Sequence, residues 1–380
     1  MKRKVLFFTT SGDYHGGGVM CLIETLRYID RDKIDPYVVI PTHGSTEEQL
    51  EALNIPYVII KNYDWLFSEG VLHSLSFKIK RPLQWFVNQI SELRIYRYLQ
   101  KMQFDAYHLN SLYSDFGVRA ATALKIPIYW HLREFVDENP WTSTFLNERK
   151  AYLVIERSHK LLAVSECIKQ FYMGKMPNAN IEVIYDGVDI ISKLRIRNNV
   201  TIRHPLRLSL IGGVSEVKGH IDAIRAVSLL IENGVKCFLS VYGRKRSSGY
   251  FQLLKEEISR LKVDSYIRFL GNKSDMQEVY NETDIVLVCS RCESFGRVAV
   301  EAMYQNIPVI GADNTGTSEL IKGNSMSILY KTGDANDLYR KIRDMANRQF
   351  DDKDLKDNHR HVMHFSSEES ARNLTTALLD

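Results

Sequence analysis

The chain has 380 residues, 44% of them hydrophobic, which is enough for two domains with ordinary cores. Its formal net charge of +4 is slight for this length and argues against a nucleic-acid-binding protein. No apolar run approaches the roughly 18 residues that cross a bilayer. The basic, then apolar N-terminus stops at Thr9 before a glycine-rich turn, which predicts a first strand and not a signal peptide. The five cysteines are odd in number and scattered, as is typical of a reducing compartment, so we expect a cytoplasmic protein.

Short β-rich runs alternate with helical patterns along the whole chain. This alternation predicts an α/β protein with two Rossmann-like, doubly wound parallel-sheet domains. The expected strands are Val5–Thr9, Tyr37–Ile40, Tyr57–Ile60, Ala106–Leu109, Ile126–His131, Leu161–Val164, Leu206–Ile211, Cys237–Tyr242, Tyr266–Leu270, Asp284–Cys289, Val309–Gly311 and Ser327–Tyr330. The segment Ile190–Pro205 is rich in Arg, Asn and Lys without a long apolar face, which predicts a linker. Ligands bind outside the carboxyl ends of such strands, so we expect two domains facing a cleft.

The first glycine-rich turn is Ser11-Gly-Asp-Tyr-His-Gly-Gly-Gly18, between the first strand and a helix that starts near Val19. Glycine lets the backbone approach a phosphate or a sugar closely. A dinucleotide-binding turn is the competing interpretation. The spacing fits Gly-x-Gly-x-x-Gly poorly, and the acidic candidates Asp30 and Asp32 precede the second strand, which disfavours it.

Residues 70–104 form the basic part of the chain, with Glu92 as the single acid. The bases there are Lys78, Lys80, Arg81, Arg94, Arg97 and Lys101. The apolar residues at helical spacing are Leu83, Phe86, Val87 and Ile90, with Trp85 and Tyr98 nearby. A basic amphipathic helix with aromatic edges can rest on an anionic bilayer, which predicts peripheral docking on the inner face of the cell membrane. The alternative is a core-packed helix with a solvated cationic face.

Two histidines, His108 and His131, are expected at strand ends in the first half. A neutral imidazole at such a position can accept a hydroxyl proton or hydrogen-bond a sugar. The alternative for either residue is a satisfied structural histidine.

In the second half, three expected strands end in glycine turns. The first turn, Leu210-Ile-Gly-Gly-Val-Ser-Glu-Val-Lys218-Gly-His220, places a lysine in a glycine-rich context. The next two are Val241-Tyr-Gly-Arg-Lys-Arg246 and Phe269-Leu-Gly-Asn-Lys273. In the absence of a ligand role, Lys218 is a solvated surface lysine.

The segment Glu293-Ser-Phe-Gly-Arg-Val-Ala-Val-Glu301 lies between an expected strand and an expected helix. It offers one carboxylate in the turn, N–H groups at a helix start that favour an anion, and a second carboxylate about one turn into the helix. The alternative is an N-capping Glu followed by a solvated helical Glu. Cys289 and Cys292 have Cys-x-x-Cys spacing, but no second pair supplies ligands, so a metal or redox site is disfavoured. His359, His361 and His364 are also closely spaced, and we interpret them as a surface turn.

The last segment resembles the Glu-x7-Glu motif of the retaining family-four glycosyltransferases, which have the two-domain GT-B fold. The resemblance implies that Glu293 holds the donor sugar, with the backbone of Phe295 and Gly296. It implies that the helix start at Arg297 and Val298 holds the diphosphate, and that Glu301 holds the ribose.

The other turns match the same family in order. The loop with Gly17 and Gly18 resembles the family's Gly-Gly loop, which faces the donor and the acceptor. Lys218 matches one of two cations that neutralise the donor phosphates. The second cation, an arginine in the family, falls at Gly213, and we expect Arg244 or Arg297 to substitute. The resemblance also implies that Gly271 and Asn272 line the nucleotide. It implies that His131, and not His108, lies near the reacting carbon, which makes His131 the catalytic candidate.

The resemblance implies a retaining hexosyltransferase that uses a nucleotide diphosphate sugar, UDP-sugar foremost, and a lipid-linked or oligosaccharide acceptor. We expect residues 1–190, with a C-terminal helix at 366–380 packing back, to bind the acceptor, and residues 191–365 to bind the donor. No Asp-x-Asp follows an expected strand, so we expect no metal and no cofactor. A role in bacterial surface-polysaccharide synthesis is the expected context. The alternatives are a nucleotide-sugar epimerase of the same fold and a non-catalytic nucleotide-sugar-binding subunit.

Overall fold

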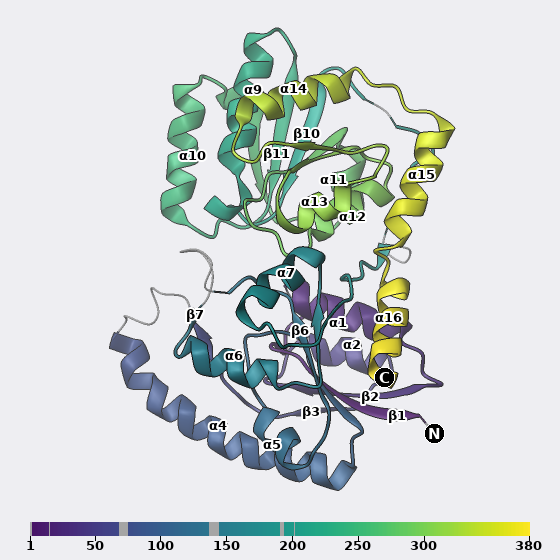
Figure 1. The fold of residues 1–380 in the computed structure, drawn as a ribbon. Helices are drawn as coiled ribbons and strands as arrows, with labels where there is room; N and C mark the ends of the chain where they lie inside the picture. The colour runs from purple at the N-terminus through teal and green to yellow at the C-terminus, as the bar shows by residue number, and fades with distance from the viewer. Residues whose placement is uncertain (1, 15, 68–74, 137–143, 191–193, 201) are drawn as a thin grey trace. The chain divides into compact units, whose positions relative to one another are not determined.

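The structure is a computed structural model that describes residues 2–14, 16–67, 75–136, 144–190, 194–200 and 202–380 (Figure 1). The side chains at 76–78, Lys78 among them, also lie outside the description. The chain forms two compact units. Unit 1 comprises Met1–Gly187 with Ser367–Asp380, and unit 2 comprises Val188–Ser366.

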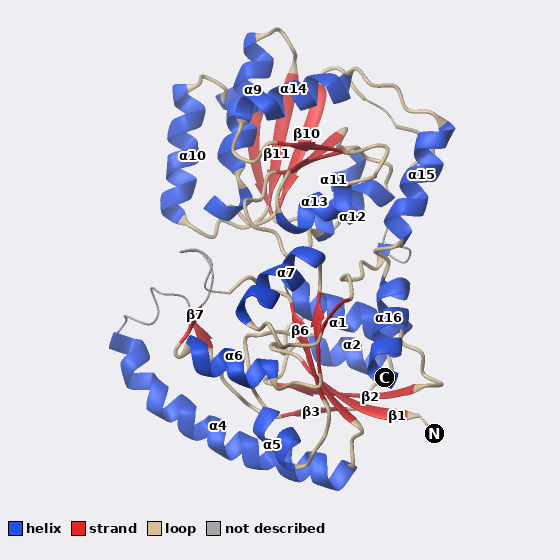
Figure 2. Cartoon of the chain, viewed as in Figure 1, coloured by secondary structure: helices blue, strands red, loops and turns tan. Residues whose placement is uncertain are grey.

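Over the described residues, unit 1 is built on a seven-stranded parallel sheet in the order β3-β2-β1-β5-β6-β8-β9 (Figure 2). The strands are β1 (Arg3–Phe8), β2 (Ile34–Ile40), β3 (Tyr57–Ile59), β5 (Ala106–Leu109), β6 (Ile128–Leu132), β8 (Lys160–Ala163) and β9 (Ile181–Val183). A separate antiparallel pair joins β4 (Leu66–Phe67) to β7 (Thr144–Phe145). The sequence predicted neither this pair nor β9, and strands of two residues carry no readable alternation.

The helices of unit 1 are α1 (Gly17–Tyr28), α2 (Thr46–Ala52), α4 (Leu75–Met102), α5 (Val118–Ala123), α6 (Glu148–Glu156), α7 (Glu166–Lys175) and α16 (Ser367–Leu379). The C-terminal helix α16 packs against α1. Leu374 and Leu378 lie in the same apolar core as Val5 and Leu22, so this helix buries its apolar face in unit 1.

Unit 2 has a six-stranded parallel sheet, counted over its described part, in the order β12-β11-β10-β13-β14-β15. The strands are β10 (Leu206–Ile211), β11 (Cys237–Tyr242), β12 (Ile267–Gly271), β13 (Ile285–Val288), β14 (Val309–Ala312) and β15 (Ile328–Tyr330). The helices are the 3₁₀ turns η1 (Glu216–Lys218) and η2 (Asp264–Tyr266), with α9 (His220–Glu232), α10 (Ser248–Arg260), α11 (Met276–Asn281), α12 (Arg297–Tyr304), α13 (Thr315–Ile321), α14 (Ala335–Ala346) and α15 (Asp352–Met363). The predicted fold class is therefore confirmed: two doubly wound parallel-sheet α/β units.

Strand order in unit 2 reverses between β10 and β13, which pair with each other. In open α/β sheets the loops after such neighbouring strands diverge to opposite faces and leave room for a ligand. The turns that carry Lys218 and Glu293 follow these two strands, so topology alone brings them to one place.

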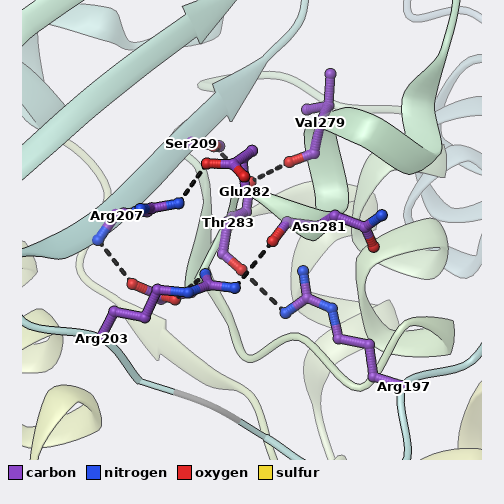
Figure 3. Close-up of polar contacts among 9 residues, drawn as sticks. Arg197, Arg203, Arg207, Ser209, Val279, Asn281, Glu282 and Thr283 are labelled. Atoms are coloured by element: carbon purple, nitrogen blue, oxygen red, sulfur yellow. Dashed lines mark hydrogen bonds and ion pairs between the residues drawn. The ribbon is translucent and has the colours of Figure 1, made fainter.

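The amino-terminal edge of the same two strands is fixed by an arginine network (Figure 3). Asp284 is fully buried and pairs with Arg203 at 2.7 Å, and it also accepts a hydrogen bond from the backbone of Arg207. Arg197 donates to the carbonyl of Thr283 at 3.1 Å. The second half of the segment expected to be a linker is thus bound to unit 2, because its arginines satisfy buried oxygens at this edge.

Candidate functional site

The loops after β10 and β13 touch directly. Gly219 has a positive φ of 63°, and a Cβ at that position would lie 2.0 Å from the carbonyl oxygen of Cys289. The backbone N–H of Arg291 also donates to the carbonyl of Val217 at 2.7 Å. Only glycine permits both the left-handed turn and this approach, so Gly219 sets the position of the neighbouring Lys218.

Lys218 and Glu293 form an ion pair, with 2.5 Å between Nζ and Oε2. Their side chains are 31% and 20% exposed, so the pair stays accessible to a ligand. The N–H of Glu293 donates to Thr315 Oγ1 at 3.0 Å, and its carbonyl accepts from the N–H of Gly316 at 2.8 Å. The start of α13 therefore holds the Glu293 turn in place, and the pair offers a cation for a phosphate beside an acceptor for hydroxyls.

Helix α12 begins immediately after this turn. Gly296 precedes it with a φ of 110°, and Phe295 is buried with its ring centroid 6.0 Å from that of Phe365. The burial of this ring leaves the backbone of Phe295 as the part that can serve a ligand. The first N–H groups of a helix favour an anion, so the beginning of α12 at Arg297 and Val298 suits a phosphate.

Glu301, one turn into α12, accepts a hydrogen bond from the hydroxyl of Tyr280 at 2.7 Å. Tyr280 is fully buried, and burial raises its pKa well above the ordinary value, so it remains a donor. The bond fixes one carboxylate oxygen of Glu301. The sequence analysis missed Tyr280, because a tyrosine on the short helix α11 has no motif that distinguishes it from core packing.

The space above Gly213 is taken by Arg246. The loop after β11 pairs with the loop after β10: Val214 N–H donates to the Arg244 carbonyl at 2.8 Å, and Arg246 N–H donates to the Val214 carbonyl at 3.1 Å. This pairing turns the Arg246 side chain over Gly213, where an added Cβ would lie 2.6 Å from Arg246 Nε. The sequence analysis named Arg244 and Arg297 as substitutes for the missing arginine, and the structure adds Arg246 as the arginine in contact with that position.

Gly271 and Asn272 lie farther along the same edge of the sheet. Gly271 has a φ of 69° at the end of β12, and its carbonyl accepts from the N–H of Gly243 at 2.8 Å. Asn272 is exposed. In the sheet, β11 lies between β12 and β10, so one strand separates the strand before Gly271 and Asn272 from the strand that leads to Lys218.

In unit 1, His108 and His131 face each other from neighbouring strands, with 3.0 Å between His108 Nε2 and His131 Nδ1. Both are buried, and burial, with the nearby Arg133 charge, lowers both pKa values, that of His108 to about 3. Both rings are therefore neutral at physiological pH. Within the described part of the chain, His131 Nε2 is buried and has no hydrogen-bond partner, so its bonding capacity is unused in this structure.

The glycine loop of unit 1 is tied to these strand ends. Asn110 Nδ2 donates to the Gly18 carbonyl at 2.7 Å, and Arg133 Nε donates to the Asn110 carbonyl at 2.8 Å. Arg133 is buried and forms an ion pair with Asp186. Gly17 and Gly18 thus begin α1 beside the ends of β5 and β6, near the strand end that carries His131.

The pH dependence of stability follows from His220, which begins α9 after Gly219 and whose pKa burial lowers to about 4. The unfolded chain takes up a proton below about pH 6.5, whereas the folded chain does not until about 4, so stability falls as pH falls through this window. When the pH falls from 7.5 to 5, the free energy of unfolding is expected to fall by about 2 kcal/mol through this residue. Urea unfolding at the two pH values should show that the free energy of unfolding falls less in His220→Gln than in the unchanged protein, and that the difference equals this amount. The control is His359→Gln, because His359 is exposed. If His220→Gln lost as much unfolding free energy as the unchanged protein, the assignment to His220 would be wrong.

Comparison with known proteins agrees with this architecture. Residues 15–191 match the model for Glycosyltransferase Family 4, and residues 195–362 match the model for Glycosyl transferases group 1. A protein of the cps region of Klebsiella pneumoniae is 26% identical, over 64% of this chain and 70% of that protein. The N-acetyl-alpha-D-glucosaminyl L-malate synthase of Bacillus anthracis is 26% identical, over 47% of this chain and 48% of the enzyme, so the chain spans about half of that relative.

Solved structures show the same fold over the whole length. Anabaena Alr3699/HepE in complex with UDP and glucose superposes with a TM-score of 0.73 at 21% identity, covering 99% of each chain. The lipopolysaccharide outer core galactosyltransferase WaaB superposes with a TM-score of 0.70 at 16% identity, over 99% of each chain. The two family matches together span most of the chain, and with the two parallel-sheet units they show that it belongs to the glycosyltransferases of the GT-B fold.

Proposed function

We propose that the protein is a retaining glycosyltransferase that moves a hexose from a nucleotide diphosphate sugar to a hydroxyl of a lipid-linked or saccharide acceptor. The observation that carries the proposal is the Lys218–Glu293 pair at the switch point of unit 2, directly before the start of α12. The complex of Anabaena HepE with UDP and glucose supports UDP-sugar as the donor class. The Klebsiella relative from the cps region supports a role in bacterial surface-polysaccharide synthesis.

In this proposal the site acts mainly on the leaving group. As the bond between the anomeric carbon and the phosphate oxygen breaks, negative charge develops on the diphosphate. Lys218, Arg246 and the first N–H groups of α12 stabilise that charge, which lowers the barrier without requiring a metal. Glu293 holds the sugar hydroxyls, and Glu301, steadied by Tyr280, holds the ribose.

The acceptor hydroxyl attacks the anomeric carbon from the side of the departing phosphate, so the configuration is retained. The hydroxyl proton passes to the departing phosphate oxygen. In unit 1, the neutral His131 accepts or donates one hydrogen bond to the reacting sugar, and Gly17 and Gly18 let the backbone approach the donor. Proton NMR of the glycosidic product tests retention through the anomeric coupling constant.

Donor binding is tested by thermal unfolding with UMP, UDP and a set of UDP-hexoses. UDP at about 100 times its dissociation constant raises the free energy of unfolding by about 2.7 kcal/mol. For units of this size, that corresponds to a rise of about 5 °C in melting temperature. UMP lacks the second phosphate and is expected to give a smaller shift at equal concentration. No shift with any nucleoside diphosphate or nucleotide sugar would contradict the proposed donor class.

Turnover with and without an acceptor separates the alternatives. A glycosyltransferase releases UDP faster when an acceptor hydroxyl is supplied. An epimerase converts or releases the sugar without an acceptor, and a non-catalytic binding subunit gives a thermal shift without turnover.

A further inference from the structure

Helix α4 in unit 1 has its apolar side turned to solvent. Its exposed large apolar residues are Leu75, Ile79, Leu83, Trp85, Phe86, Ile90 and Leu93, exposed by 41% to 73%. Except for Trp85 they recur at intervals of three or four residues, so they form one stripe along the helix, here called the α4 stripe. Figure 1 shows α4 along one side of unit 1, next to α5. A soluble helix normally buries such a stripe.

The opposite side of α4 is fastened to unit 1 by polar contacts. Asn88 exchanges two hydrogen bonds with the backbone of Tyr63, at 2.8 and 2.9 Å. Ser91 donates to the carbonyl of Lys61. Glu92 accepts from the N–H of Ala120 at 2.9 Å, at the start of α5. Because polar contacts hold the inner side of α4, the helix is fixed with its apolar stripe facing outward. The stripe is therefore not a core-facing surface that has rotated out of place.

The charges on the outer side of α4 are positive. Lys80, Arg94, Arg97 and Lys101 are exposed, whereas the one acid of the segment, Glu92, is used by the inward contacts. At about 100° per residue, Arg97 and Lys101 continue the line of the α4 stripe. The helix thus offers apolar side chains and cations to the same neighbour.

We propose that the α4 stripe and its flanking bases dock unit 1 on an anionic lipid bilayer, with α4 lying in the plane of the interface. A second copy of the chain is the poorer occupant, because pairing two such faces would bring bases against bases without acids to oppose them. No helix in the described part of the chain is long and apolar enough to cross a membrane. The inference does not depend on the donor site.

The test is sedimentation of the full-length protein with vesicles of phosphatidylcholine, with and without phosphatidylglycerol, at low salt. Binding is expected with phosphatidylglycerol and at least about tenfold weaker without it, since each base near an anionic surface contributes to binding. The double substitution Leu83→Asp with Phe86→Asp is expected to lower binding by more than about tenfold. Arg94→Glu with Arg97→Glu is expected to remove the preference for phosphatidylglycerol.

The control is Leu253→Asp, at a solvent-exposed leucine on α10 of unit 2, which should bind vesicles as the unchanged protein does. The melting temperature without ligand should be the same in all variants, which shows that they fold and keeps this test independent of donor binding. No vesicle binding at low salt would overturn the proposal. A concentration-dependent dimer that Leu83→Asp with Phe86→Asp abolishes, without vesicle binding, would overturn it in favour of a second copy.

Discussion

Replacing Lys218 or Glu293 with alanine is expected to lower sugar transfer by about 10²- to 10³-fold, the range measured when one group stabilising developing charge is removed. Lys218→Ala removes a cation from the leaving diphosphate, so kcat should fall more than KM rises. Glu293→Ala removes the acceptor for the sugar hydroxyls and misplaces the anomeric carbon. Initial rates with saturating donor, followed by UDP release, provide the measurement.

Both variants should fold, because a partly exposed pair contributes about 1 kcal/mol or less to stability. Glu282→Ala is the matched control. It removes the carboxylate of the Arg207–Glu282 pair at the opposite ends of the same strands, and its rate should be unchanged. Rates close to that of the unchanged protein in both Lys218→Ala and Glu293→Ala would show that the site lies elsewhere.

Arg246→Ala is expected to lower transfer by about 10- to 100-fold, because it removes the second cation available to the diphosphate. Arg244→Ala, from the same loop, is the matched comparison and should have a much smaller effect. The reason is positional: the Arg246 side chain lies over Gly213, the position at which the motif of the family resemblance would place an arginine.

A rescue experiment makes this assignment sharper. Gly213 does not have a positive φ, so an arginine is allowed there by the backbone, but its Cβ would meet Arg246 Nε at 2.6 Å. The double variant Gly213→Arg with Arg246→Ala should therefore recover part of the rate lost in Arg246→Ala, whereas Gly213→Arg alone should not be faster than the unchanged protein. An equal loss in Arg244→Ala and Arg246→Ala, with no rescue, would remove Arg246 from this role.

The sequence was sufficient for most of the fold because strands buried on both faces have continuous apolar runs, as in Asp284–Cys289, which contains β13. It failed for β9 and for the β4–β7 pair, whose few residues are defined by their neighbours in the sheet. Motifs 75 positions apart assign Lys218 and Glu293 to one donor site, and the structure places their side chains in contact, while their roles toward a donor stay predictions.

The remaining features of the site and of α4 could not be predicted from the sequence, because they depend on tertiary contacts. Which arginine lies over Gly213 is decided by the bridge between Val214 and Lys245, and no sequence pattern reveals this pairing. The same holds for His131, whose neutral state comes from burial beside His108. On α4 the sequence predicted a basic amphipathic helix, but the polar anchoring by Asn88 and Glu92 shows which side faces solvent.

The most direct measurement is a crystal structure of the protein with UDP. We expect the diphosphate within hydrogen-bond distance of Lys218 Nζ, of the Arg246 guanidinium and of the first N–H groups of α12, with Glu301 on the ribose. UDP bound at another place, or a site between β10 and β13 that stays empty at saturating UDP, would contradict the proposed donor site.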